Sequence, residues 1–572
     1  MRRRDLMAGV AASVLTGRGA LAQNIATDPI FQFVKPSPIT LNLLGPLDSR
    51  WTFARASQGT QVQSGVLNYA PNNLFTYSQD FSNAIWTTNA ATTKTAAYAV
   101  APDGTTTAAR VQLVSAGNQN VTWFQQNVSG AGLGASATNT VSFWFKSNTG
   151  GSQTFAIKST QAGVADHFSG DLTATTTWQR LSYSVAFGAG GSGYYAGVSV
   201  GSALAAADIL VWGAQLEQNT TMGAYNPTTT AAYYGPRFET SPAGYLNQPQ
   251  ATNFILQSKT LTTAPWILQG AFNFSNVTGP DGAMSGWQGA VGGGGQGFYQ
   301  YITGLTASTR YEPSIWILPI TTTGTVEITN PWSALLGDWR VNLALLSAGW
   351  NYVTRSSSAV TIISEFTSDA TGRSGIYVYT FDGTLRTAAF SSAQIELGTF
   401  STSAIATTTA AATRAADNLT LDLTQFPGLQ RTGGYSCAIE FSLLSNNNQS
   451  QVVFGMSGAG GFSNTWYFSD DGAGGLRVTT IVATVNQTSA SATLRTVSLT
   501  NRLALTVTPT GITFNLNGAG DVTVTNAGMP TMTTLAVLRA PWNASNYEAG
   551  HATLVTLVPG PQSAAWRASR SY

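Results

Sequence analysis

The chain carries one sequence pattern twice, about 180 residues apart. A segment that starts at Asn73 and closes at Trp86 returns as one that starts at Asn253 and closes at Trp266, so both ends shift equally (253−73 and 266−86). Four later positions recur in the same order, at offsets of 178, 172, 172 and 179 residues: Pro102 and Pro280, Phe143 and Ile315, Thr177 and Gly349, and Gly213 and Ser392. Solenoid repeats have periods of about 20 to 50 residues, so this repeat indicates a duplicated domain.

A duplicated domain suits a binding protein, because the second contact with a repetitive ligand becomes intramolecular once the first is made. The remaining boundaries follow from changes in composition along the 572 residues, a length that predicts several domains. We predict a signal or docking peptide, an irregular N-terminal arm, module 1, a linker, module 2, a second linker, a C-terminal domain and a short tail. Their respective ranges are 1–22, 23–70, 71–226, 227–250, 251–406, 407–417, 418–565 and 566–572.

Composition excludes several classes of function. Charged residues make up only 9% of the chain, against about 25% in an average protein, whereas 43% of residues are hydrophobic. The net charge is +2 with no long basic run after the first residues, so nucleic acid is not expected as a partner. The single Cys437 rules out an intrachain disulfide, and two histidines, His167 and His551, leave little material for histidine-dependent catalysis.

Short strand-like segments dominate the chain after residue 23. Val141–Lys146, Leu181–Phe187, Ile376–Phe381 and Gly511–Asn517 are rich in β-branched and aromatic residues and are bounded by Gly, Asn, Asp or Ser. No long segment shows a helical period. Many short strands with regular turns predict an all-β protein built from antiparallel sandwiches.

The first 22 residues have the layout of an export signal. Arg3 and Arg4 precede two apolar residues, as in twin-arginine signals, an apolar run covers residues 8–15, and Ala20 and Ala22 form a cleavage pattern. This reading places the protein in the periplasm or outside the cell. The alternative is a peptide that docks the protein onto a larger assembly. The apolar run is too short for a bilayer, so no membrane span is expected.

Two sets of motifs resemble known families. Asn73 with Trp86, then Val141–Lys146, Trp178–Phe187 and Ile209–Glu217, resemble the jelly-roll carbohydrate-binding modules found beside glycoside hydrolases, although Pro319 replaces Lys146 in the second copy. The joining segments resemble phage and prophage appendage proteins; they are Arg50–Ser57, Gly235–Gly244 and Gln250–Ser258. The resemblance implies tandem jelly rolls in a tail-fibre, tail-associated or head-spike protein on the virion surface.

The C-terminal domain resembles laminin-G and concanavalin-like lectin sandwiches. Arg502–Thr506 and Asn515–Gly518 match the hairpin of that family. Together the resemblances imply a homo-oligomeric adhesin that binds cell-surface glycans and contacts other virion proteins. An exported carbohydrate-binding protein, a polysaccharide depolymerase and a purely structural capsid or tail decoration remain alternatives.

Candidate binding residues are aromatic and amide side chains, because flat rings stack on sugars while amides bond to hydroxyls. The recurring tryptophan pairs suit a core, so the candidates lie elsewhere. Trp123 and Gln125 lie in a cluster that matches Phe298, Tyr299 and Gln300 in the second copy. Trp332 and Trp339 lie in a segment that looks like an exposed loop. The full set is Trp123, Gln125, Tyr299, Trp332, Trp339, Trp466 and Trp542.

Catalysis and cofactors are not expected. No strand carries the alternating carboxylates of a concanavalin-like hydrolase, although carboxylates from distant segments could converge in space. A structural calcium ion is left open, with Asp103, Asp208, Glu217 and Glu396 as candidate ligands. We therefore predict a non-enzymatic binding protein without catalytic residues, whose metal ligands, if any, the sequence does not identify.

Overall fold

A computed structural model describes most of the chain after residue 37. The described residues are 38–572, except 115–117, 130–132, 134–137, 188–192, 271, 293–295, 431–432, 445–450, 472–474, 493–499, 526–527, 530 and 543–547. The predicted signal peptide therefore lies outside the described residues. Among the described helices, none is long and apolar enough to cross a membrane.

Module 1 is a sandwich of two antiparallel sheets, with strand orders β14-β10-β16-β8-β7 and β12-β11-β15-β9-β6, and β13 pairs with β11. Side chains of both sheets meet in one core, where the rings of Phe145 and Phe155 lie 4.3 Å apart. Its elements are β5 (Asn72–Asn73), β6 (Trp86–Thr88), β7 (Thr92–Ala99), β8 (Ala108–Leu113), η1 (Gln119–Val121), β9 (Trp123–Asn127), β10 (Thr138–Ser147), β11 (Gln153–Ala162), β12 (Ala165–Phe168), β13 (Leu172–Ala174), β14 (Gln179–Ala186), β15 (Gly193–Val200) and β16 (Ala207–Glu217).

Module 2 repeats this architecture with strand orders β22-β23-β31-β25-β28 and β21-β24-β30-β26-β27-β29. Its elements are β20 (Ala251–Asn253), β21 (Ile267–Gln269), β22 (Ser275–Val277), β23 (Gly286–Val291), β24 (Gly297–Ile302), β25 (Tyr311–Pro319), β26 (Thr325–Thr329), η2 (Ala334–Leu336), β27 (Asp338–Asn342), η3 (Leu343–Leu345), β28 (Asn351–Val353), β29 (Val360–Ser364), β30 (Ser374–Tyr379) and β31 (Arg386–Leu397). The prediction of tandem antiparallel sandwiches is confirmed.

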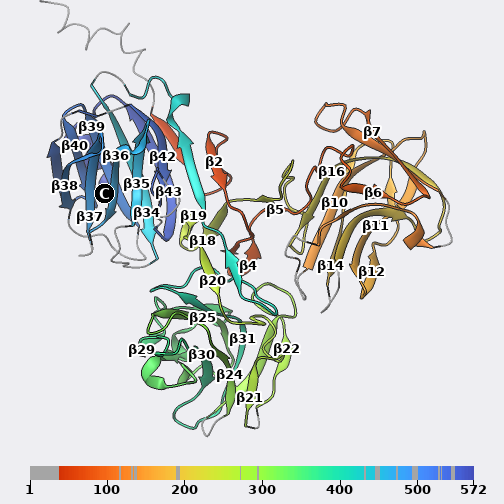
Figure 1. The fold of residues 1–572 in the computed structure, drawn as a ribbon, viewed down its shortest axis with the longest axis horizontal. Helices are drawn as coiled ribbons and strands as arrows, with labels where there is room; N and C mark the ends of the chain where they lie inside the picture. Colours follow the sequence, from red (N-terminus) through yellow and green to blue (C-terminus); the bar gives the residue numbers. More distant parts are fainter. Residues whose placement is uncertain are drawn as a thin grey trace, which may run out of the picture.

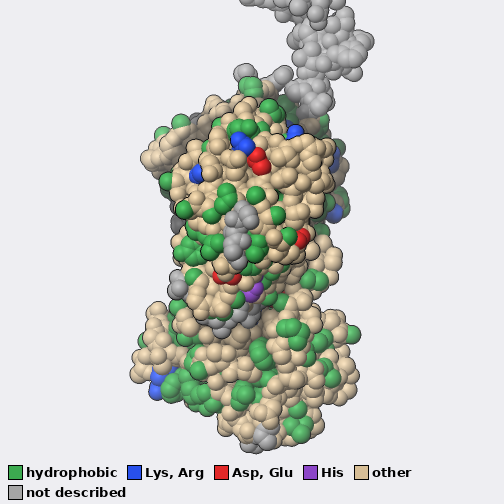
Figure 2. Space-filling view, turned by 90° about the vertical axis from the view of Figure 1, so that its right-hand side faces the viewer, with side chains coloured by type: hydrophobic (Ala, Val, Ile, Leu, Met, Phe, Trp, Pro, Cys, Tyr) green, Lys and Arg blue, Asp and Glu red, His purple; other side chains and the backbone are tan. Residues whose placement is uncertain are grey.

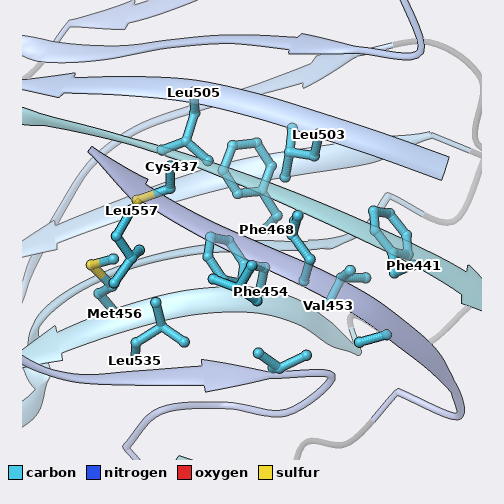
Figure 3. Packing of buried hydrophobic residues seen from close by; sticks show 14 of the residues in the cluster. Cys437, Phe441, Val453, Phe454, Met456, Phe468, Leu503, Leu505, Leu535 and Leu557 are labelled. Atoms are coloured by element: carbon cyan, nitrogen blue, oxygen red, sulfur yellow. The ribbon is translucent and has the colours of Figure 1, made fainter. Parts of the chain in front are cut away.

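The C-terminal domain is a third sandwich, and its core joins the two sheets through side chains such as Cys437, Phe454, Met456 and Phe468 (Figure 3). β32 (Ala412–Arg414) lies in the second linker and pairs with β20 of module 2. The domain's own elements are β33 (Asn418–Asp422), η4 (Leu423–Gln425), β34 (Tyr435–Leu443), β35 (Val452–Gly458), β36 (Gly461–Asp470), β37 (Leu476–Val482), β38 (Val485–Ala492), β39 (Asn501–Thr508), β40 (Gly511–Leu516), β41 (Asp521–Thr525), β42 (Met532–Val537), β43 (Gly550–Pro559) and α4 (Ala564–Ser571).

Segments far upstream complete this domain. One sheet has the order β18-β19-β43-β34-β39-β40-β41 with β1 also on β43, and the other has the order β2-β33-β42-β35-β36-β37-β38. The upstream strands in these two sheets are β1 (Ile39–Asn42), β2 (Trp51–Ala54), β18 (Arg237–Thr240) and β19 (Ala243–Asn247). β3 (Thr60–Gln63) and β4 (Val66–Tyr69) form a separate hairpin, and β17 (Tyr233–Tyr234) pairs with β5. The arm expected to be irregular and the first linker are thus rich in strands, because each pairs its backbone with the distant sheets. Figure 1 shows β2, β4, β18 and β19 between the three sandwiches, which are module 1, module 2 and the C-terminal domain.

The recurring tryptophans differ in burial. Trp86 and Trp266 are buried in the two cores, and each indole N–H donates to a carbonyl nine residues earlier, at 2.9 and 3.0 Å. Trp316 is also buried. Trp178 and Trp350 are half-buried and bond to neighbouring backbone. The recurrence therefore marks scaffold positions.

Recurring polar residues form the same hydrogen-bond network in both modules. Asn73 donates to the carbonyls of Ala214 and Asn226, at 2.9 and 2.8 Å. Asn253 donates to the equivalent carbonyls of Ala393 and Ile405, at 3.2 and 2.9 Å. Each asparagine thus ties the entry of its module to the last strand and the exit, which explains why the opening motif recurs.

The recurring glutamates shape the loop after the last strand of each module. The Glu217 carboxylate accepts the amide N–H of Gly223 at 3.0 Å, and Glu396 accepts the hydroxyl of Thr402 at 2.6 Å, six residues further on in both cases. Both glutamates are buried. These contacts give the two carboxylates a structural role in place of the calcium ligation considered above.

A buried ion cluster lies where the N-terminal arm, the two linkers and module 2 meet. The Asp417 carboxylate pairs with Arg55 at 2.8 Å, with Arg237, and with Arg414 at 3.7 Å. All four side chains are buried. Although burial acts to raise the pKa of Asp417, the guanidinium charges hold it below its usual value. We call these four residues the arginine cluster.

Backbone and side-chain acceptors bind further N–H groups of the three guanidinium groups. Arg55 donates to the Gly235 carbonyl at 2.8 Å, and Arg414 donates to the Pro249 carbonyl at 2.6 Å. Arg237 donates to the Gln248 side chain at 2.8 Å and to Ser403 of module 2. The cluster therefore fixes the N-terminal arm, both linkers and module 2 at one point.

Replacing Asp417 by Asn should destabilise the protein by about 3–5 kcal/mol, because three buried guanidinium groups lose their only carboxylate within the described cluster. Denaturant unfolding followed by tryptophan fluorescence measures the loss. Asp48→Asn is the control: its pair with Arg50 is about one-third exposed, so its removal should matter little. Equal losses in the two variants would contradict this account.

Module 2 should lose stability as the pH rises from about 4.5 to about 7. Burial raises the pKa of Glu396 from 4.5 to about 7, so the folded state keeps a proton that the unfolded state releases within that window. The contribution is fully present below pH 4.5, disappears as the pH rises and amounts to a few kcal/mol. Unfolding free energies of the wild type and Glu396→Gln should therefore diverge steadily across this range; a constant difference would refute the assignment.

Candidate functional site

The outer face of one sheet of module 2 is lined by tyrosines. In β30, Ile376 and Val378 point into the core, whereas Tyr377 and Tyr379 alternate onto the outer face. The neighbouring strand β24 presents Tyr299 opposite Tyr377. The rings touch in a continuous series, with centroid distances of 5.4 Å between Tyr299 and Tyr377 and 4.7 Å between Tyr377 and Tyr379.

Trp332 extends this series from the loop after β26. Its ring lies 4.6 Å from that of Tyr301, which in turn lies 5.0 Å from Tyr299. The indole N–H donates to the Ser374 carbonyl at 3.0 Å, and the Arg373 guanidinium covers the ring at 4.2 Å. Trp332 nevertheless stays 37% exposed. A ring held in this way can stack on a ligand with little further loss of conformational entropy.

A cavity of about 390 Å³ opens beside these rings. Trp332, Tyr377 and Tyr379 line it together with Gln269, which is exposed, and Asn330, which is 2% exposed and uses its side-chain amide to hold the Trp332 loop. Phe381, which is 70% exposed, stands at its edge. The combination of flat rings and amides is the chemistry expected for binding a polyhydroxylated ring. We call this surface the module 2 face.

Buried carboxylates lie next to the module 2 face. Glu327 pairs across the sheet with Tyr379 and lies 3.4 Å from the Arg340 guanidinium, and it is 2% exposed. Burial, reinforced by nearby Asp338, raises the pKa of Glu327. Burial and the Glu327 charge raise the pKa of Tyr379 to about 12. Tyr379 therefore remains a neutral phenol at physiological pH.

Module 1 presents a different set of side chains on its corresponding sheet. Trp123 and Gln125 alternate with the core residue Phe124 along β9, so both point away from the core; Trp123 is half-buried, whereas Gln125 is only 7% exposed. Lys158 of β11 reaches to 6.0 Å from the Trp123 ring and 3.7 Å from Asp166. Burial lowers the pKa of Lys158. We call this surface the module 1 face.

The hydrogen bonds settle how the two strands correspond. Gln126 and Gln300 each accept an amide N–H from the opening segment of their module, from Thr76 at 3.0 Å and from Leu256 at 2.7 Å. In the alignment of the two modules, Phe124 is therefore equivalent to Phe298, and Gln125 is equivalent to Tyr299. The predicted match of Trp123 with Phe298 is therefore one residue out of register, because Phe298 is a core side chain.

Two candidate residues are core residues in the structure. The expectation that Trp339 is an exposed loop residue is wrong: it is 0% exposed in β27 and packs against Phe366, at 5.6 Å between rings. Trp466 is also 0% exposed, and its indole N–H donates to the Tyr435 hydroxyl at 2.8 Å. Trp542 is half-buried and contacts Tyr467 and the exposed Phe462 in the C-terminal domain, away from the module faces.

Sequence reasoning missed Tyr301, Tyr377 and Tyr379. The signal was present, since Tyr299-x-Tyr301 and Tyr377-x-Tyr379 each place two rings on one side of a strand. The candidate calcium ligands, in contrast, do not converge: Asp208 pairs with Arg110, and no group of three acidic, His or Cys side chains that could hold a metal occurs among the described residues.

Comparison with known proteins gives no family assignment. No family model matches the chain, and no curated protein matches it. Among solved structures, the tandem CBM22-1–CBM22-2 domain of Xyn10C from Paenibacillus barcinonensis is similar at 12% identity and a TM-score of 0.22, covering 57% of this chain and 97% of that one.

Two further structures show similarity of the same order. Domain 4 of the extracellular arabinanase AbnA from Geobacillus stearothermophilus, in complex with arabinotriose, matches at 12% identity and a TM-score of 0.22, covering 27% of this chain and 73% of that one. The CBM40 of Ruminococcus gnavus IT-sialidase, bound to sialyllactose, matches at 12% identity and a TM-score of 0.22, covering 26% and 91%. Similarity at this level transfers no ligand or activity to this chain.

Proposed function

We propose that this protein is a non-enzymatic adhesin that binds cell-surface polysaccharide through the faces of its two modules. The observation that carries the proposal is the ring series of the module 2 face, from Trp332 to Tyr379, beside a cavity of about 390 Å³. Stacked rings and amides are worth about 0.5–1.5 kcal/mol per contact, so single sites bind weakly and two modules raise the avidity.

The surface supports binding without strong charge. Figure 2 shows a face on which Lys, Arg, Asp and Glu atoms are sparse, in keeping with 9% charged residues in the chain. Glu327 and Asp338 come together in space, but both are buried and neither is free to flank a scissile bond. They support the tyrosines rather than a hydrolytic reaction.

We place the adhesin on a phage or prophage-derived particle, as a homo-oligomer attached to other virion proteins, because the joining segments resemble appendage proteins. Those segments contain Arg55 and Arg237, which belong to the arginine cluster, and Asn253, which ties the entry of module 2 to its exit. The second candidate is an exported bacterial carbohydrate-binding protein, which the paired Arg3 and Arg4 and the Ala20–Ala22 pattern favour. Both candidates use the same faces.

The mature N-terminus separates the two candidates. Mass spectrometry of the native protein should find residues 1–22 intact in purified particles if the protein is a virion component. Cleavage after Ala22 in a periplasmic or secreted fraction would reject the virion location and support the exported protein.

Removing rings from the module 2 face should abolish most glycan binding. We expect Trp332→Ala combined with Tyr377→Ala to weaken binding to purified host capsule or to a glycan array about 5- to 100-fold, because two stacking contacts disappear. Tyr98→Ala is the control. Tyr98 is 45% exposed, but it lies in β7, which belongs to the sheet of module 1 that does not carry the module 1 face. Binding that survives the double variant, or is lost equally in the control, would refute the proposed site.

A further inference from the structure

We propose that the cleft between module 1 and the strands at the junction of the three sandwiches is a second binding site, which takes a neutral oligosaccharide. The cleft has a volume of about 790 Å³, within the range of about 300–1,000 Å³ typical of ligand sites. One wall is the loop after β16, from Glu217 to Asn226, and the other consists of the loop 44–49, β2, the hairpin β3–β4 and β18. It lies apart from the outer sheet faces of both modules.

The hairpins form a partition with two different faces. Along β3, Gln61 and Gln63 line this cleft, whereas Val62 faces the pocket on the side of module 2. Along β18, Phe238 lines the cleft and Glu239 faces the other side. Strand alternation thus directs amides and a ring to module 1 and places the carboxylate on the opposite side.

The wall of the cleft carries aromatic rings that no neighbouring element covers completely. Phe53, Tyr69, Tyr233 and Phe238 line it and are half-buried. Trp51 also lines it but is only 6% exposed, because its ring packs in the core of the C-terminal domain. The four half-buried rings are therefore the ones available for stacking on a ligand.

The charges of the lining point to a neutral ligand. Among the described residues of the lining, Asp48 and Glu217 are the carboxylates and none is Lys or Arg. Asp48 is neutralised by Arg50 at 2.6 Å, and Glu217 is 1% exposed and holds the Gly223 amide. Rings, amides and hydroxyls without net charge suit a neutral sugar chain better than an anionic one.

The test uses the full chain with both module faces disabled by Trp123→Ala, Trp332→Ala and Tyr377→Ala. Isothermal titration with cellotetraose, maltotetraose and xylotetraose should reveal one site per chain for at least one of them. Tetragalacturonate, the anionic probe, should bind more weakly. If the disabled chain binds no neutral tetrasaccharide at millimolar concentration, or prefers tetragalacturonate, the cleft proposal is overturned.

Two variants in the same background locate the site. Thr221→Trp fills the cleft from an exposed loop position and should weaken binding at least tenfold, whereas Thr230→Trp, exposed but outside the lining, should leave it unchanged. Binding unaffected by Thr221→Trp would overturn the proposal. Both module faces are disabled in every one of these titrations. A negative result for the cleft therefore does not change the result for the module 2 face, and a positive result for the cleft does not depend on that face.

Discussion

The ion pairs of Asp417 hold together the N-terminal arm and the two linkers, the segments that lie between the sandwiches. Arg55 follows a strand of the N-terminal arm, Arg237 begins β18, and Arg414 ends β32, so residues from three distant parts of the chain share one buried carboxylate. Moving any of these arginines away would leave a buried charge without its partner. Such a loss lowers the stability far more than the loss of a surface ion pair does. The hairpins β3–β4 and β18–β19 are held beside this cluster, and they divide the cleft of module 1 from the pocket of module 2.

The sequence predicted the fold class and the duplication because both depend on local patterns. Alternation along short strands and regular turns is visible in one segment at a time. The recurring Asn73 and Asn253, and Glu217 and Glu396, were recognised as a repeat, and the structure shows why they recur: each closes a network within its own module. Local patterns did not reveal that the N-terminal arm and the first linker contribute strands to the C-terminal domain, since that pairing spans hundreds of residues.

The candidate site was harder to predict because alternation identifies two faces without saying which one is buried. Trp332 and Trp339 look alike in sequence, but Trp332 lies in a loop held by Asn330, whereas β27 begins at Asp338 and turns Trp339 into the core. In β30, both the aliphatic and the tyrosine positions are apolar enough to form a core. Only the packing of the opposite sheet decides that Ile376 and Val378 point inward and Tyr377 and Tyr379 outward.

The difference between the module 1 face and the module 2 face affects which kind of polymer the proposed adhesin can bind. Avidity requires that both modules find their own sites within reach on one ligand. The module 1 face carries Lys158 beside Trp123, whereas the module 2 face carries tyrosines backed by Glu327. Under the proposed function we therefore expect the two faces to differ in the sugar they bind, and we expect a homopolymer to match one face better than the other. A polysaccharide with a mixed repeat unit can satisfy both, and because the arginine cluster fixes the junction through which the modules are joined, the spacing of its units becomes a second criterion for recognition.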